Sequence, residues 1–454
     1  MKLRTLTALA LLLASPLLAS PKDAVVGIDG EVYVARSGNA SNLFPGLAGT
    51  SDGEFNALAV DISFADGTSR RMGVPHSVGP EFEQNPQLFF EDASGTVFLI
   101  WESWKNYIHP SLKLVGLKDG AWSPVVTIQG NRFSPKGAPK LQITRDEYMV
   151  PAEDGGTRLQ HRTILHLTWW EETGDGDKVL YAPVTLIDGS FPSDSPPTIE
   201  LNDFDPAADG EGAGLAARLA RYPNLQPGRD EASLTAIFAN PRSDRVVSFE
   251  LDVVPGEIVG IGDAARSHII EIGAHGGGGI QSISSAARSH IIEIGARLDV
   301  EPRFARFLAD QTRDEILALG DAGDSLEIES LAETARSHII EIGARMSRPG
   351  MERSNSLPAT FLEVSLGEVP HGNHLIRLLP IADWAAPELE DGLEPVLYGS
   401  ADGDELLIAA DDENSVRYIE TRPEGWSGPR NLTFDDTIDR ARAHSILEER
   451  ARHR

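Results

Sequence analysis

The sequence predicts a mainly β fold: a β-propeller of repeated antiparallel four-stranded blades that carries an inserted, partly helical segment. Three observations lead to this prediction. Short β-rich runs alternate with turn clusters, one arrangement of strands with a Trp-Ser pair occurs twice, and a ten-residue motif occurs three times. The first two predict the blades, and the third marks the insertion.

The first 20 residues are typical of a secretory signal peptide. Lys2 and Arg4 precede an apolar run that reaches Leu18, and the small residues Ala19 and Ser20 follow it. This is the order of a signal peptide that is cut near its small residues. The apolar run is shorter than the roughly 20 residues that a membrane-spanning helix needs. The sequence therefore predicts a secreted or periplasmic protein without a membrane span, with a signal anchor as the alternative.

The composition excludes several kinds of site and partner. The chain has no cysteine, and its formal net charge is −29. Disulfides and Cys-ligated metal are therefore excluded, and the stability must come from a core. A strongly negative field repels phosphate backbones and anionic lipid, so we expect no nucleic-acid partner. The predicted partner is a protein or a carbohydrate.

Five stretches of the chain predict strands joined by tight turns. In each of them, Val, Ile, Tyr, Phe and Trp flank a cluster of Asp, Gly or Asn. That composition favours hairpins, and its recurrence predicts antiparallel sheets. The stretches are Ala24–Gly38, Pro86–Trp104, Thr163–Leu186, Ala232–Val254 and Pro395–Arg422.

Two of these stretches begin the same longer unit. In each, a hairpin is followed by a further strand and then by Trp-Ser and Pro, at Trp122–Pro124 and at Trp426–Pro429. Repeated sheets with Gly and Trp marks are typical of a β-propeller. The units resemble blades of the sialidase-like group of exported bacterial β-propellers, over about Asp23–Val254 and Pro358–Thr433. The sequence departs from that group in its Asp-box, of which Ser94–Thr96 is only a fragment.

A segment of different composition interrupts the β pattern. It covers residues 255–357, is rich in Ala, Arg, Glu and Gly, and separates the blades at 21–254 from closing blades at 358–433. Within it, Glu301–Asp324 has apolar residues at the spacing of one or two amphipathic helices. Residues 434–454 predict a C-terminal helix.

The motif ARSHIIEIGA stands at Ala265–Ala274, Ala287–Ala296 and Ala335–Ala344. Flanking caps and glycines favour a helix, whereas Ile-Ile-Glu-Ile is a composition preferred in strands. On a helix, the His and Glu of each copy would share a face and could offer ligands to a metal ion. We interpret the motif as a packing or duplicated element and predict no metal site. The pairs are His268/Glu271, His290/Glu293 and His338/Glu341.

Two aromatic clusters supply the candidate ligand-binding residues. They are Trp101, Trp104 and Tyr107, and the pair Trp169-Trp170. Adjacent side chains of a strand face opposite sides, so one Trp of a pair must meet either a neighbouring sheet or solvent. An exposed indole at the mouth of a propeller is a platform for a sugar ring or a peptide. The alternative is that these rings pack between blades.

No cofactor is predicted, although two acidic loops leave Ca²⁺ as an open alternative. Asn202–Gly212 and Gly174–Asp177 bring carboxylates close together, as this oxygen-loving ion requires. Neither loop matches the Asp-x-Asp-x-Asp-Gly pattern, so we interpret both as solvated turns.

The predicted function is binding of a protein or a glycan by an exported β-propeller, without catalysis. The alternative is a glycoside hydrolase of the sialidase-like type. The resemblance implies catalytic arginines, a tyrosine nucleophile and an acid, none of which the sequence allows us to assign. Glu102 and Asp92 are carboxylates available to such a site. Several carboxylates with arginines at one mouth of the propeller axis would favour the hydrolase.

Overall fold

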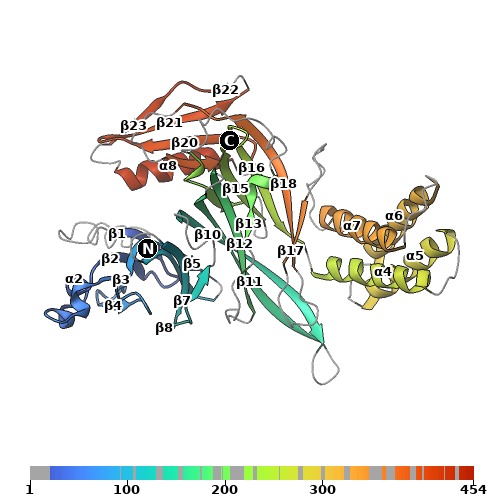
Figure 1. The fold of residues 1–454 in the computed structure, drawn as a ribbon, viewed down its shortest axis with the longest axis horizontal. Helices are drawn as coiled ribbons and strands as arrows, with labels where there is room; N and C mark the ends of the chain where they lie inside the picture. Colours follow the sequence, from blue (N-terminus) through green and yellow to red (C-terminus); the bar gives the residue numbers. More distant parts are fainter. Residues whose placement is uncertain are drawn as a thin grey trace. The chain divides into compact units, whose positions relative to one another are not determined.

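The computed structural model divides the chain into two compact units (Figure 1). The first comprises Met1–Arg145, Thr163–Glu250 and Pro380–Arg454, and the second Asp146–Arg162 and Leu251–Leu379. The predicted signal peptide lies outside the described residues. These are 21–92, 94–105, 109–128, 136–151, 157–173, 176–187, 196, 198–204, 219–228, 233–254, 256–274, 280–297, 302–321, 328–346, 360–364, 374–388, 395–400, 403–423, 425–434 and 439–453.

The prediction of a mainly β protein with repeated four-stranded sheets is confirmed. The described strands form five sheets, whose recorded pairings are antiparallel. Sheet A has β1 (Pro21–Val26), β2 (Val32–Asn39), β3 (Asn56–Ser63) and β4 (Ser69–Gly73); sheet B has β5 (Phe82–Glu91), β6 (Thr96–Lys105), β7 (His109–Lys118), β8 (Ala121–Trp122) and β9 (Val126–Ile128); sheet C has β10 (Lys136–Pro151), β11 (Thr157–Thr173), β12 (Gly176–Ile187) and β13 (Ile199–Glu200); sheet D has β14 (Asn224–Pro227), β15 (Ser233–Asn240), β16 (Arg245–Val253), β17 (Thr360–Val364) and β18 (His374–Ala385); sheet E has β19 (Pro395–Gly399), β20 (Leu406–Asp411), β21 (Ser415–Arg422), β22 (Gly425–Trp426) and β23 (Arg430–Thr433).

All five predicted hairpin stretches contain successive strands. Gly30, Gly95 and Gly403 occupy three of the turns between them with φ of +85°, +65° and +70°, a region in which glycine has no Cβ to clash. Asp244 adopts φ +56° in a fourth turn, which Asp tolerates better than most residues. Local turn chemistry therefore determines where these strands end.

The repeated Trp-Ser unit is confirmed in detail. In sheet B, the Ser123 hydroxyl accepts a hydrogen bond of 2.9 Å from the backbone N–H of Gly116, and Ser123 N donates to the Gly116 carbonyl. In sheet E, Ser427 forms the same two bonds with Glu420, seven residues earlier. Both sheets also carry a fifth strand that pairs with the third one, β9 with β7 and β23 with β21.

Successive sheets pack against each other through alternating side chains of their strands. On β6, Val97, Leu99 and Trp101 join a core with sheet A, while Phe98 and Ile100 join a core with sheet C. Because both faces of sheet B are covered, β6 is apolar on both sides instead of alternating with polar residues. The sequence pattern of this strand thus reflects its position between two neighbours.

Helices cover the outer faces of the first and last sheets. The short helix α2 (Ala40–Leu43) packs with Ala57 and Ala59 of β3. The predicted C-terminal helix is α8 (Arg440–Arg452), which begins at Asp439, whose side chain accepts from Arg442 N. Ala443, Leu447 and Ala451 of α8 pack on Tyr398, Leu407, Ala409 and Val416 of sheet E.

The described residues show no closed ring of sheets.

The described residues of the second unit form four helices, which gather into one bundle in Figure 1. They are α4 (Gly256–Ala274), α5 (Ile280–Arg297), α6 (Pro302–Asp321) and α7 (Ile328–Met346). All three copies of the repeated motif are helical, which confirms the helix among the two conformations considered. None of the described helices is both long and apolar enough to cross a membrane.

Equivalent positions of the three motif copies form the core of the bundle. The first alanine and first isoleucine of each copy have no exposed surface: Ala265 and Ile269, Ala287 and Ile291, Ala335 and Ile339. On α6, Thr312 and Ile316 are equally buried at the same spacing. Asp310 and Arg313 on α6 repeat the spacing of Asp263 and Arg266 on α4. We therefore interpret α6 as a diverged fourth copy, which exact matching of the sequence missed.

Candidate functional site

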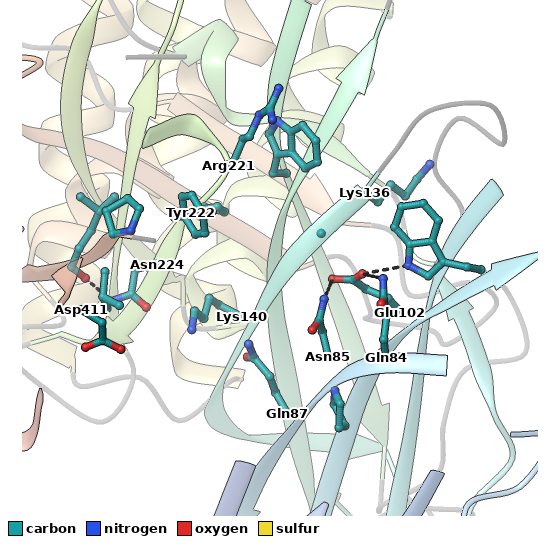
Figure 2. Close-up of a pocket in the computed structure, with 18 residues that line it drawn as sticks. Gln84, Asn85, Gln87, Glu102, Lys136, Lys140, Arg221, Tyr222, Asn224 and Asp411 are labelled. Atoms are coloured by element: carbon teal, nitrogen blue, oxygen red, sulfur yellow. Dashed lines mark hydrogen bonds between the residues drawn. The ribbon is translucent and has the colours of Figure 1, made fainter. Parts of the chain in front are cut away.

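A cavity of about 550 Å³ in the first unit collects polar and aromatic side chains from four sheets (Figure 2). The first strands of sheets B, C, D and E all contribute to its lining. Its volume lies within the range of small-molecule pockets. The polar and aromatic lining residues are Gln84, Asn85, Gln87, Glu102, Trp104, Lys136, Lys140, Trp170, Arg221, Tyr222, Asn224 and Asp411.

Glu102 is a buried carboxylate at the centre of a hydrogen-bonded group in this cavity. Gln84 Nε2 donates to its Oε2 at 3.2 Å, and Asn85 Nδ2 donates to its Oε1 at 2.9 Å. Trp104 Nε1 also donates to Oε2, at 3.0 Å, from two residues along the same strand. Figure 2 shows both amides pointing at the carboxylate. Three N–H donors offset the cost of burying this charge.

A β-bulge in β5 brings the two amides to Glu102. The pairing of β5 with β6 shifts register between Gln84 and Gln87. Asn85, within the bulge, adopts φ +49°, a left-handed conformation in which Asn is enriched. A bulge redirects side chains and often lies beside a functional site. Here it turns Gln84 and Asn85 toward the same carboxylate.

Gly137 on β10 leaves room for Glu102. A Cβ at this position would lie 3.3 Å from Glu102 Oε1 and 3.8 Å from Trp170 Cε3. A larger side chain would therefore push against both the carboxylate and the indole. On the cavity wall, the charged residue Lys136 is therefore followed directly by a glycine whose missing side chain leaves space for the Glu102 carboxylate.

Lys136 forms a buried ion pair at the cavity. Its Nζ lies 3.5 Å from Glu171 Oε1, and both side chains are 2% exposed. Burial lowers the pKa of Lys136, whereas the carboxylate of Glu171 opposes that shift. A buried pair of this kind adds little net stability, because the cost of removing both charges from water offsets their attraction.

The guanidinium of Arg221 stacks on one of the two cavity indoles. Its Cζ lies 4.8 Å from the ring centroid of Trp170, and its Nε lies 3.6 Å from Asp177 Oδ2. The stack combines cation–π attraction with an ion pair, which fixes both side chains.

Asp411 lines the cavity from the end of β20 and is held by helix α8. His444 Nε2 lies 2.7 Å from Asp411 Oδ1, and Arg440 Nε lies 3.2 Å from Oδ2. Tyr398 Oη lies 2.8 Å from the other ring nitrogen of His444. Burial raises the pKa of Tyr398, and the carboxylates of Glu448 and Asp411 raise it further. The C-terminal helix thus orients one acidic group of the cavity.

The structure separates the five predicted aromatic residues. Trp104 and Trp170 line the cavity. Trp101 and Trp169 are fully buried, so for these two rings the structure shows the alternative, packing between sheets. Their strand positions face the cores shared with sheets A and B, because neighbouring residues of a strand point to opposite faces. Tyr107 lies outside the described residues.

Other residues of the cavity escaped the sequence analysis. Glu102 was considered and lines the cavity, whereas Asp92 is in an exposed turn. The Asn85-Pro86 pair inside an apolar strand run is a signal for a bulge, since Pro is confined to edges and irregularities of sheets. Nothing in the sequence pairs Lys136, Arg221 and Asp411 with this bulge.

Several residues considered for metal binding contact each other or neighbouring residues. His268 Nδ1 lies 3.9 Å from Glu271 Oε2, and the His268 ring stacks on His290 with centroids 4.2 Å apart. Asn202 Oδ1 accepts from Val179 N, and Asp203 pairs with Arg242 at 2.8 Å. Among the residues that the structure describes, no group of three His, Cys, Asp or Glu is close enough to hold a metal ion.

No protein-family model matches this chain, and no curated protein matches it. The solved structures similar to it include a Mycobacterium tuberculosis puromycin-hydrolyzing peptidase, with 14% identity, 53% of this chain and 30% of that chain covered, and a TM-score of 0.27. A Cellvibrio cellulosa α-L-arabinanase complexed with arabinohexaose has 13% identity, 51% and 73% coverage, and a TM-score of 0.23. A GH43 endo-arabinanase from Bacillus licheniformis has 11% identity, 50% and 92% coverage, and a TM-score of 0.17. Similarities at this level carry no argument, so the resemblance to sialidase-like propellers stays a prediction.

Proposed function

We propose that this protein binds a glycan in the cavity and does not cleave it. The observation that carries the proposal is the lining, in which the amides of Gln84, Asn85, Gln87 and Asn224 lie with the indoles of Trp104 and Trp170. An amide both donates and accepts hydrogen bonds, as a sugar hydroxyl does. An indole offers an apolar face for the C–H surface of a sugar ring.

The way in which the cavity's carboxylates are engaged supports binding without cleavage. Both oxygens of Glu102 accept N–H bonds from neutral side chains. Both oxygens of Asp411 contact residues of α8. A general acid must hold a proton on one carboxyl oxygen and pass it to the leaving group. Each of these oxygens would first have to give up a contact, so the carboxylates act as fixed acceptors.

The proposal includes a propeller-like arrangement of the five sheets and export of the chain. The first strands of four successive sheets line one cavity, as strands nearest a propeller axis would. Export by the predicted signal peptide would place this cavity where extracellular or periplasmic glycans are available.

Calorimetric titration with neutral oligosaccharides tests the proposal. Trp104→Ala and Trp170→Ala should each weaken binding about tenfold or more, since a loss of about 1.4 kcal/mol of stacking is tenfold in affinity. Trp426→Ala is the matched control, because Trp426 is half-buried in sheet E outside the cavity and donates to the Ala385 carbonyl. Equal affinities in all three variants would contradict the proposal, as would a lack of any binding.

A glycoside hydrolase is the second candidate, favoured by one observation. Glu102 and Asp411 reach the same cavity from different sheets, and most glycoside hydrolases use a pair of carboxylates. Release of reducing ends from the bound oligosaccharide distinguishes the two candidates. A hydrolase would release them and lose this activity in Glu102→Gln, whereas a binding protein would leave the oligosaccharide intact.

A further inference from the structure

A group of three arginines surrounds one buried glutamate in sheet E, apart from the cavity lining. Glu420, on β21, has a side chain that is 1% exposed. Arg430 Nη1 on β23 lies 2.9 Å from its Oε1, and Arg450 Nη2 on α8 lies 3.0 Å from its Oε2. Arg422 Nη2 lies 3.8 Å from Oε1. We call these four residues the arginine cluster.

Regular secondary structure holds the arginine cluster in place. The backbone N–H of Glu420 donates to the Ser427 hydroxyl at 3.0 Å. Arg450 lies over the Tyr418 ring, with its Cζ 5.4 Å from the centroid, and its Nη1 lies 3.3 Å from Tyr418 Oη. Two strands and a helix thus fix guanidinium groups that would otherwise be flexible. Ligand binding would therefore cost little additional side-chain entropy.

The charges within the arginine cluster do not balance. Among the residues that the structure describes, the ion pairs of these three guanidinium groups share one carboxylate, so the arginine cluster itself carries two more positive than negative charges on a chain whose net charge is −29. Arg417, on the same strand as Glu420, instead forms an ion pair of 3.0 Å with Asp412. The surplus is therefore local to the arginine cluster.

The arginines also keep surface through which they can reach a ligand. Their side chains are 37–39% exposed, although each approaches the buried carboxylate. A guanidinium has five N–H donors, more than its contact with Glu420 engages. The planar fork of arginine matches the oxygens of sulfate and phosphate groups.

We propose that the arginine cluster binds a doubly charged tetrahedral oxyanion, either a free sulfate or phosphate ion or the phosphate monoester group of a ligand. The two negative charges of this group match the two surplus positive charges, and its oxygens accept from the outward-facing N–H groups. The buried carboxylate of Glu420 contacts all three arginines and holds them together. The proposal does not depend on glycan binding in the cavity.

Binding of inorganic sulfate and inorganic phosphate, measured on the full chain at low ionic strength and pH 8, tests this site. The NMR signals of the arginine Nε–H groups report which side chains respond, and acetate serves as a singly charged comparison. Wild type should bind both dianions more tightly than acetate. Arg422→Gln should weaken their binding about tenfold, because it removes one charge-assisted contact. Arg417→Gln is the matched control on the same strand and should bind like wild type.

Arg422 makes the longest of the three contacts with Glu420, so its substitution is the one least damaging to the fold. Arg430→Gln provides a second variant, and the melting temperature of each variant shows whether it is folded. A phosphorylated sugar then distinguishes a phosphate monoester from a free ion as the source of the oxyanion, and the singly charged sulfate ester of the same sugar is its comparison. The proposal is overturned if acetate binds as well as sulfate, if Arg422→Gln binds sulfate like wild type, or if wild type binds neither dianion.

Discussion

Sheets B and E repeat each other in a different way from helices α4, α5 and α7. The two sheets share only a loose sequence pattern, yet Ser123 and Ser427 form the same hydrogen bonds to a strand residue seven positions earlier. The three helices share ten identical residues, yet the arginines of the motif differ in their partners. Arg266 pairs with Glu333 at 2.6 Å, and Arg288 pairs with Asp310 at 2.5 Å.

The comparison shows that a repeat reproduces those contacts whose partners belong to the repeat itself. The serine and its strand partner lie within one unit, so a similar pattern gives the same bonds twice. The arginine partners lie on other helices, outside the identical residues. Between helices α4 and α7 the pairing is reciprocal. Asp263 and Glu333 each stand three residues before the arginine of their own helix, and each pairs with the motif arginine of the other helix. On α5 the equivalent position is Ser285, and this reciprocity is lost.

Substitution of the motif isoleucines should have the largest effect on the helices. Ile269→Ala, Ile291→Ala and Ile339→Ala each remove a fully buried side chain. Each should cost about 2–5 kcal/mol of unfolding free energy, the range for such truncations in cores. Helical ellipticity of the three single variants during denaturant unfolding measures this effect.

The matched control replaces the motif histidines with glutamine. His268, His290 and His338 are half-buried, so the triple variant should lose much less stability than any one isoleucine variant. The melting of wild type should not rise with Zn²⁺ or Ni²⁺. A rise that disappears in the histidine variant would show a metal site and contradict our interpretation of the motif as a packing element.

The sequence predicted contacts that depend on neighbouring residues and missed those that depend on distant ones. Turn residues located all five hairpins, and the local sequence of residues 434–454 located the C-terminal helix. Strand alternation showed that Trp169 and Trp170 face opposite sides, but which side is covered depends on another sheet. Likewise, the amides that reach Glu102 depend on a bulge 17 and 18 residues away in the chain.

Acid should destabilise the first unit through His166. This residue is fully buried, with its ring nitrogens 2.7 Å from Thr144 Oγ1 and from Tyr181 Oη. Burial lowers the pKa of His166 to about 3, whereas an unfolded histidine titrates near pH 6.5. The unfolded state therefore binds more protons as the pH falls below about 6.5. We expect a loss of about 2 kcal/mol between pH 8 and pH 5.

The variant His166→Gln provides the comparison for this pH effect. Urea unfolding of wild type and of His166→Gln at pH 8 and pH 5 measures it, because the variant lacks the group that must stay neutral. The difference between the two pH values should be smaller in His166→Gln by about 2 kcal/mol, whatever that variant costs at pH 8. The same pH dependence in both proteins would show that another group is responsible.

Loss of the serine hydroxyl tests whether the two sheet units are energetically equivalent. Ser123→Ala and Ser427→Ala each leave one backbone N–H without its acceptor, at Gly116 and at Glu420. Each should cost about 1 kcal/mol, typical of one intramolecular hydrogen bond. Unfolding in urea measures both variants. Costs that differ severalfold would show that equal geometry in sheets B and E does not give equal stabilisation.

The arginine pairs of the helices should show the smallest effect and the clearest asymmetry. Arg336 is 11% exposed and contacts Asp263 at 2.5 Å and Glu333 at 3.5 Å. Arg288 is 36% exposed and pairs with Asp310. Exposed ion pairs contribute about 0.2–1 kcal/mol, so we expect a coupling near the upper end for Arg336–Asp263 and near the lower end for Arg288–Asp310. Double-mutant cycles with Arg→Gln and Asp→Asn isolate each coupling. Equal couplings would mean that the identical motif, and not the neighbouring helix, determines what its arginine contributes.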